Sequence, residues 1–151
     1  MEDRFIAIAS AALIVVAGVA GCSSPPSLSP RPPGSLPPLT AHLTINGEDA
    51  GTTQSVECSQ VQHYMTVKTG DESQGVIAVV QSVDNGARLV ASSVQINNVG
   101  GFTGGYWQNL VGDATASMAG QTYTVTGTAD GFDTNRPDKR TTGTFTIKAA
   151  C

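Results

Sequence analysis

The stretch Thr122-Tyr123-Thr124-Val125-Thr126-Gly127-Thr128-Ala129 decides the fold of this chain. Threonine alternates in it with apolar or small residues, and a period of two is typical of a β-strand that has one face in the core and one in solvent. The last residues of the chain follow the same rule, because Phe145, Ile147 and Ala149 share one parity and polar residues stand between them. Two one-sided strands predict antiparallel β-structure in this part of the chain.

The period of two extends toward the N-terminal side of the chain. Leu43 and Ile45 alternate with polar residues, and the Asn46-Gly47 pair that follows is a strong turn signal. The run 76–80 is apolar throughout, so we expect a strand that is buried on both faces; a buried helical turn is the alternative, because it has the same apolar pattern. The sequence therefore predicts one all-β domain over residues 41–151, an antiparallel β-sandwich or open barrel.

Two cysteines of this domain form an even pair. Cys58 shares the parity of Val56 in an early strand, and Cys151 shares the parity of Phe145 in the last one, so both should point to the interior. In an exported protein such a pair is expected to form a disulfide. The alternative, two reactive thiols, lacks a neighbouring His or Lys or a CxxC motif that would lower a thiol pKa. We predict a Cys58–Cys151 bridge that closes the domain and makes its first and last strands neighbours.

A short apolar run, residues 5–20, ends at Val19-Ala20-Gly21-Cys22. Small residues before a cysteine at the end of such a run are typical of a bacterial lipoprotein signal, which is cleaved before the cysteine. An ordinary signal or a transmembrane helix is the alternative, but a span needs about 20 apolar residues and this run is shorter. The start, Met1-Glu2-Asp3-Arg4, is more acidic than such signals usually are. We predict a lipoprotein signal peptide over residues 1–21 and lipid attachment at Cys22, whose acyl chains would anchor the protein to a membrane.

Residues 22–40 form a linker rich in proline and serine, with seven of the eight prolines of the chain. Proline cannot continue a helix or donate to a strand ladder, so the linker should be extended, at about 3.1 Å per residue. We expect a disordered linker that holds the β domain away from the bilayer. Recognition by a proline-reading partner is the alternative.

Charge and motifs exclude several functions. The 151-residue chain has a net charge of −4 and no basic patch in its sequence, so nucleic acid is not an expected partner. No GxSxG, HExxH or Walker-type sequence occurs. We expect a strand over residues 61–67, in which His63 shares the apolar parity of Val61, Met65 and Val67 and should be a core residue. The other histidine, His42, has the polar parity and should be solvated. We predict no enzyme activity, no cofactor and no metal site.

Two stretches of the domain invite a ligand-binding interpretation. Gly100–Gly105 looks like a phosphate loop, but it lacks the Lys-Ser/Thr ending and opens no helix, so a bulge or tight bend is expected. Phe102, Tyr106 and Trp107 should pack in the core, and the alternative is that they line a groove for a glycan or lipid.

Four oxygen donors gather in an expected polar loop before the last strand: Asp130, Asp133, Asn135 and Asp138. Such donors could hold calcium, but their spacing does not fit an EF-hand. Arg136, Lys139 and Arg140 in the same loop can neutralise the acids without a metal. Turn capping by the Asp and Asn side chains is therefore the expected role.

Four patches follow one another along the chain: Val19–Cys22 with its spacer, Val56-x-Cys58, Asn98–Tyr106, and Tyr123–Asp133 with Asn135, Pro137 and Cys151 beyond it. Together they resemble the mycobacterial 19 kDa lipoprotein antigen family (LpqH-type) over nearly the whole domain. The spacer departs from the family's pattern, because it is rich in Pro and Ser where better-known relatives have Thr- and Ala-rich, O-mannosylated spacers.

The resemblance implies an exported, acylated cell-envelope protein without known enzymatic chemistry, lipid-anchored on the extracytoplasmic side of the cell membrane. Family members are regarded as surface antigens and adhesins, and host Toll-like receptor 2 senses their acylated N-terminus, which here maps onto Cys22. The expected partners are then the membrane and a host receptor or an envelope glycan or lipid. The alternative function is a carrier of a small apolar ligand, a lipid or glycolipid, in a pocket of the β domain.

Overall fold

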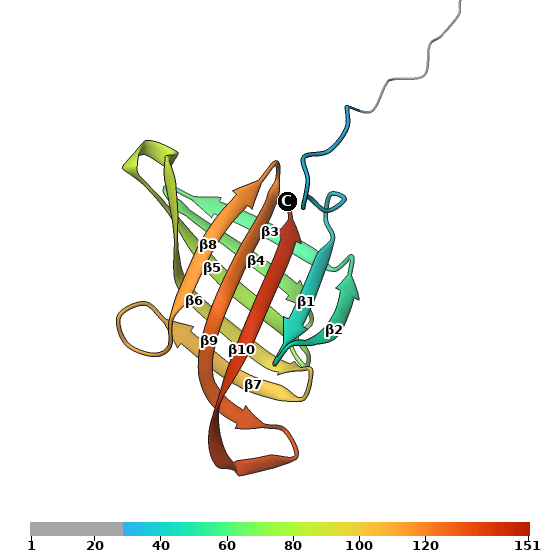
Figure 1. Ribbon diagram of the computed structural model, residues 1–151, viewed down its shortest axis with the longest axis vertical. Coiled ribbons are helices and arrows are strands. Elements are labelled where there is room, and N and C mark those ends of the chain that lie inside the picture. Colours follow the sequence, from blue (N-terminus) through green and yellow to red (C-terminus); the bar gives the residue numbers. More distant parts are fainter. Residues whose placement is uncertain (1–28) are drawn as a thin grey trace, which may run out of the picture. The chain divides into compact units, whose positions relative to one another are not determined.

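The computed structural model describes residues 29–151, whose regular structure consists of β-strands and one short 3-10 turn, η1 (Figure 1). The elements are β1 (Ala41–Ile45), β2 (Glu48–Thr53), β3 (Val56–Val61), β4 (Tyr64–Gly70), β5 (Gly75–Val83), η1 (Asp84–Gly86), β6 (Arg88–Val99), β7 (Phe102–Trp107), β8 (Ala114–Ala119), β9 (Thr122–Asp133) and β10 (Arg136–Ala150). Strand β1 begins at the predicted start of the domain. The prediction of an all-β fold is confirmed.

All strands belong to one antiparallel sheet, in the order β2-β1-β10-β9-β7-β6-β5-β4-β3, with β8 paired to β9. Strand β9 joins the two parts of the sheet, because its first half pairs with β8, its second half pairs with β7, and β10 runs along its other edge. The sheet is folded into two layers, and Figure 1 shows β8, β9, β10, β1 and β2 crossing over the strands β3 to β7. Within the described residues the end strands β2 and β3 are not paired with each other, so the sheet is not closed.

One apolar core fills the space between the layers. It combines side chains of β1, β5, β6, β7, β9 and β10, among which Phe145 and Ile147 are each 2% exposed. The ring of Phe102 lies against two glycines from different strands. A Cβ atom would come within 2.7 Å of this ring at Gly104 and within 2.9 Å at Gly143. The two glycines therefore leave the room that the phenylalanine ring occupies.

The strand faces that the period of two predicts are confirmed over most of β9 and in β10. The prediction is wrong at the start of β9, because Thr122 has the outward parity but is 1% exposed and accepts a hydrogen bond from the Leu36 N–H of the linker. In β9, Val125 and Ala129 are buried at 2% and 0% exposure, and Thr126 between them is exposed. The prediction for β5 is wrong, because Val76 is 1% exposed whereas Ile77 is 37% exposed. The second layer covers only one face of this strand, so an all-apolar run still presents alternate side chains to solvent.

The prediction for His63 is also wrong. The expected strand over residues 61–67 is interrupted by a two-residue turn, Gln62-His63, and His63 is exposed in it. Gln62 adopts a φ of 53°, in the left-handed region that turns require and that Gln rarely supplies. No Gly, Asn, Asp or Pro lies in this turn, so no local sequence signal predicts it.

The last part of the proline-rich linker, residues 31–40, forms no helix or strand but contacts the β domain. The Leu36 N–H donates to Thr122 Oγ1 at 2.8 Å, and the Leu39 N–H donates to the Ala150 carbonyl at 3.0 Å. Thr40 is buried, with 7% exposure. The linker therefore meets the domain at the end where β9 begins and β10 ends.

Candidate functional site

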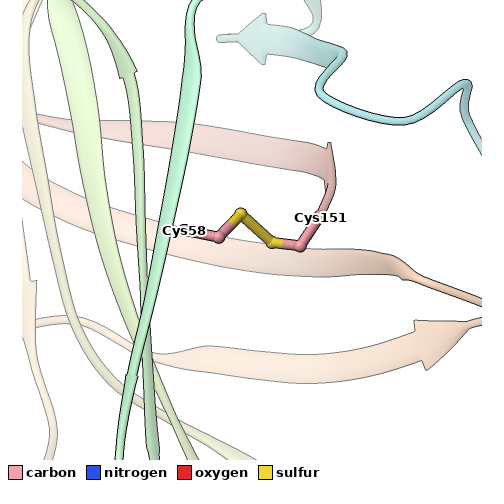
Figure 2. Close-up of a disulfide and its surroundings, with 2 residues drawn as sticks. All are labelled: Cys58 and Cys151. Atoms are coloured by element: carbon pink, nitrogen blue, oxygen red, sulfur yellow. A yellow bond between two sulfur atoms is a disulfide. The ribbon is translucent and has the colours of Figure 1, made fainter.

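The predicted disulfide is present between Cys58 and Cys151, with sulfurs 2.03 Å and Cα atoms 5.9 Å apart (Figure 2). Cys58 lies on the end strand β3, and Cys151 follows β10. Ala41, Val67 and Ala149 form a small buried cluster beside the bridge. Because β3 and β10 share no hydrogen-bonded ladder in the described residues, the covalent bond ties the two layers together at the end of the domain where the linker arrives.

The aromatic trio does not line a common groove. Phe102 and Tyr106 are 2% and 4% exposed in the core, and the Tyr106 hydroxyl donates to the Ala91 carbonyl at 3.0 Å. Burial, with a smaller contribution from the charge of Asp113, raises the pKa of Tyr106. Trp107 is the next residue of β7, so it points to the opposite face and is 46% exposed. Core packing therefore describes the first two aromatics, and Trp107 stands alone on the outer face.

The glycine-rich stretch makes a tight bend. Gly100 and Gly101 lie between β6 and β7 with φ angles of 57° and 73°, in the left-handed region that glycine enters without strain. The chain then continues as strand β7. This is the expected role for the glycines of the stretch.

The expected polar loop before the last strand is instead part of a long β-hairpin. Asp130 and Asp133 belong to β9, and Asp138 belongs to β10. Asp133 Oδ1 accepts the Asn135 N–H at 2.8 Å, which is the expected capping of a turn, and Asp130 Oδ1 accepts the Thr142 hydroxyl at 2.9 Å. Over residues 29–151, no three His, Cys, Asp or Glu side chains lie close enough together to hold a metal ion.

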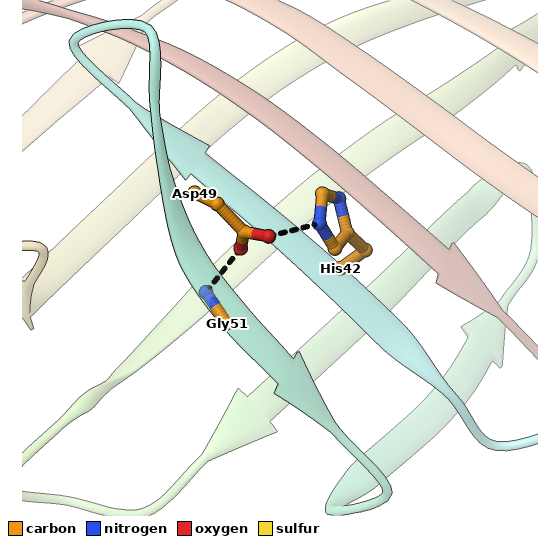
Figure 3. Close-up of polar contacts among 3 residues, drawn as sticks. All are labelled: His42, Asp49 and Gly51. Atoms are coloured by element: carbon orange, nitrogen blue, oxygen red, sulfur yellow. Dashed lines mark hydrogen bonds and ion pairs between the residues drawn. The ribbon is translucent and has the colours of Figure 1, made fainter.

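A histidine–carboxylate pair lies on the hairpin of β1 and β2 (Figure 3). His42 Nε2 is 3.2 Å from Asp49 Oδ2, and the Gly51 N–H donates to Asp49 Oδ1 at 2.7 Å. The Gly51 hydrogen bond, followed by the one from His42, holds the pKa of Asp49 below its ordinary value. His42 is half-buried rather than fully solvated, and no Ser, Thr or Cys side chain of the described chain is hydrogen-bonded to it. The pair fastens the end strand β2 to β1.

Three basic side chains that the sequence assigned only to charge neutralisation lie together in the structure. Arg136, Lys139 and Arg140 line one groove, together with the bend at Gly100 and Gly101. The sequence could not place the bend beside the bases, because more than thirty residues separate them along the chain.

The predicted signal peptide, residues 1–21, and the predicted lipid attachment site, Cys22, lie outside the described residues. The part of the chain that the structure does describe contains no helix with the length and apolar character needed to cross a membrane.

Comparison with known proteins decides the family. Residues 34–151, which include the whole β domain, match the family described as Mycobacterium 19 kDa lipoprotein antigen. The chain belongs to this family. The match begins within the part of the linker that contacts the domain, which agrees with the hydrogen bonds of Leu36 and Leu39.

Several relatives within the 19 kDa lipoprotein antigen family are similar to the chain over nearly their full length. A lipoprotein of Mycobacterium indicus pranii is 37% identical, over 95% of this chain and 96% of the relative. The lipoprotein LppE of Mycobacterium tuberculosis is 34% identical, over 100% of both chains. The lipoprotein LpqH of Mycobacterium bovis BCG is 32% identical, over 97% of this chain and 96% of the relative. The 19 kDa family is a family of lipoprotein antigens and not of enzymes, and its names indicate a membrane-anchored envelope protein.

Proposed function

We propose that this chain is an adhesin-like surface antigen of the cell envelope. Its signal peptide is cleaved before Cys22, acyl chains on Cys22 anchor it on the extracytoplasmic side of the cell membrane, and the linker displays the β domain outward. The observation that carries the proposal is the cysteine at the end of a short apolar run, in a chain whose family consists of lipoproteins.

The build of the domain supports a role in presentation and binding rather than in catalysis. The disulfide and the hydrogen bonds of residues 36–40 lie at the same end of the domain. A pulling force transmitted through the linker would therefore act on the end of the domain that the disulfide cross-links. The His42–Asp49 pair joins two strands and has no nucleophile bonded to it in the described residues. We propose that the protein works through its lipid and its outer surface.

We also propose that host Toll-like receptor 2 senses the acylated N-terminus. The receptor would bind the acyl chains and the residues just after Cys22, and the β domain would not be required for this step. A host receptor or an envelope glycan or lipid would be the partner of the domain itself.

Replacing the lipidated cysteine tests the anchor. The Cys22→Ala variant should leave the membrane fraction and lose activation of reporter cells that express Toll-like receptor 2, because no thiol remains to be acylated. The Trp107→Ala variant is the matched control, since Trp107 is exposed on the domain and should not change either result. Membrane retention and full receptor activation by Cys22→Ala would contradict the proposal.

The carrier function is the second candidate, and one groove favours it. A groove of roughly 320 Å³ between β2 and the turn that joins β4 to β5 has Leu43 and Val99 among its lining residues. These two core side chains are 6% and 3% exposed, so the floor of the groove touches the core, but the core side chains remain almost fully covered. If the domain carries lipid, mass spectrometry of a solvent extract should find a lipid in stoichiometric amount in the purified protein and in its Cys22→Ala variant. A lipid-free protein would exclude this candidate.

A further inference from the structure

A groove at the tip of the hairpin of β9 and β10 has a composition unlike the rest of this acidic protein. Its volume is roughly 400 Å³. Its lining residues come from the turn after β1, from the bend between β6 and β7 with the start of β7, and from the hairpin, and they include Asn46, Gly101, Asp133, Arg136, Lys139 and Arg140. Two hydrogen bonds hold the hairpin tip against the bend, from the Thr134 N–H to the Gly101 carbonyl at 2.8 Å and from Thr134 Oγ1 to Asn98 Oδ1 at 2.9 Å.

The groove is positively charged. Arg136, Lys139 and Arg140 are exposed, and none of them is within 4.0 Å of a carboxylate oxygen in the described part of the chain, where the ion pairs involve other residues. Asp133 is the one acid among the described residues that line the groove. The lining residues therefore carry a net charge of about +2, on a chain whose net charge is −4.

A shift in strand register brings the three bases together. Arg136 pairs with Asp133, but Arg140 pairs with Phe132, so the intervening residues bulge out of the ladder. A bulge aims side chains away from the regular alternation of a strand. Asp130, the other acid of β9, is bonded to Thr142 and does not line the groove. Asp138 does not line the groove either, so only one of the three acids beside the bases in sequence is a lining residue.

We propose that this groove binds a phosphate ester of a polyol. Guanidinium groups present a planar fork of donors that matches phosphate oxygens, and lysine adds a compact charge. Gly101 faces open space and carries no side chain, so the backbone of the bend can approach a ligand closely. Thr141 and Asn46 also line the groove. The Thr141 hydroxyl and the Asn46 side-chain amide group can bond hydroxyls of the polyol, while Asn46 Oδ1 accepts the Thr144 N–H at 3.0 Å. The volume of the groove fits one such group rather than an extended polymer.

The groove and the linker contacts lie near opposite ends of β9. The linker contacts Thr122, where β9 begins, and the groove includes Asp133, where β9 ends, up to about 36 Å further along the strand at about 3.3 Å per residue. Figure 1 shows the hairpin of β9 and β10 and the arriving linker at opposite ends of the domain. The ligand is a soluble phosphate ester or the headgroup of a lipid.

Calorimetry with glycerol 3-phosphate tests the proposal. The full chain, as the expressing cell processes it, is titrated in phosphatidylcholine nanodiscs at low ionic strength, with glycerol as the uncharged comparison. We expect heat of binding for glycerol 3-phosphate and none for glycerol. The Arg136→Gln, Lys139→Gln, Arg140→Gln triple variant should bind at least about tenfold more weakly, because it loses the charge-assisted hydrogen bonds.

A second triple variant distinguishes binding in the groove from non-specific electrostatic attraction of the phosphate to basic side chains. Arg31→Gln, Lys68→Gln, Arg88→Gln removes the same charge from residues outside the groove, and its affinity should stay within about twofold of the parent. No binding by the parent chain, or equal losses in the two triple variants, would overturn the proposal.

Asp133→Asn provides a test in the opposite direction. The variant removes the carboxylate of the groove but keeps an oxygen that can accept the Asn135 N–H. Affinity for glycerol 3-phosphate should rise by about two- to fivefold, because a like charge no longer opposes the phosphate. An unchanged or lower affinity, with an unchanged melting temperature, would contradict the assignment of the ligand to this groove.

Flotation with vesicles distinguishes the two sources of the phosphate. Nanodisc-held protein is mixed with phosphatidylcholine vesicles that contain or lack phosphatidylglycerol. Co-flotation that requires phosphatidylglycerol and the three bases assigns the ligand to a lipid headgroup, and calorimetric binding without co-flotation assigns it to a soluble ester. The proposal extends the proposed function. If Cys22 is not acylated, the chain stays outside the nanodiscs, and the same calorimetric titration of the free chain still measures binding at the groove, so the anchor and the groove can fail separately.

Discussion

Removal of the disulfide by Cys58→Ser and Cys151→Ser should destabilise the domain by about 4.7 kcal/mol in the chain-entropy model, because the bridge spans 93 residues of sequence. A domain of this size has a free energy of unfolding of about 5 to 15 kcal/mol, so the loss is at least about a third of the total. Strand β3 should respond most strongly. It pairs only with β4, and its residues are half-buried or exposed.

Urea unfolding followed by circular dichroism gives the change in free energy, and hydrogen exchange gives its location. The reduced parent chain is the control, because it lacks the bridge but keeps both cysteines, and it should match the double variant within about 1 kcal/mol. Amides of β3 should lose more protection than those of β9. A double variant that stays within about 1 kcal/mol of the oxidised parent would refute the reasoning, since the unfolded chain would then gain little freedom from the loss of the bridge.

Three further predictions concern the core, the strand contacts and one turn. Phe102→Ala should cost about 3 to 5 kcal/mol of unfolding free energy by urea titration, and Trp107→Ala on the outer face should cost less than about 1 kcal/mol; equal costs would contradict the assigned faces. Gly131→Ala should cost about 1 to 3 kcal/mol in the same assay, because a Cβ there would collide with the Thr103 carbonyl of β7; a neutral variant would show that the strands separate easily. The Ser73 hydroxyl, together with the backbone N–H groups of Gln74 and Ser73, holds the pKa of Asp71 below its ordinary value. These hydrogen bonds therefore stabilise the fold above about pH 4, and the stabilisation is lost as the pH falls through the lowered pKa of Asp71. Asp71→Asn should weaken this pH dependence in melting curves, and an unchanged acid limb would contradict it.

The sequence predicted the fold class and the disulfide because both depend on parity. A period of two assigns each side chain to a face, and the cysteines shared the inward face of their strands with Val56 and Phe145. The order of the strands did not follow from such local information. Nothing near β9 in the sequence indicates that β8 and β7 take successive halves of one edge, since that depends on how the whole sheet folds into layers.

The errors at His63 and Ile77 have physical causes. Gln62 adopts a left-handed conformation in the Gln62-His63 turn, although Gln does not favour it. The alternation of apolar and polar residues continues across this turn, so the sequence pattern predicted one uninterrupted strand. In β5 only some side chains of the apolar run are buried, and Ile77 is exposed. A single apolar side chain on an exposed sheet face costs little free energy, so an apolar run does not prove burial on both faces.

The candidate groove was beyond prediction for another reason. The sequence placed Arg136, Lys139 and Arg140 beside three acids and indicated a neutral loop. A strand bulge and a bend from a distant part of the chain turned the bases into one wall of a groove. The bulge and the approach of the bend both depend on tertiary structure, so the local sequence around the bases does not predict them.

Intact-mass spectrometry of the protein from the membrane fraction, before and after reduction, tests the central claim most directly. The account predicts a chain that begins at Cys22, carries the added mass of two or three acyl chains, and gains about 2 Da when the Cys58–Cys151 bond is reduced. A chain that still begins at Met1, or one that starts elsewhere without lipid and fractionates as a soluble protein, would contradict it.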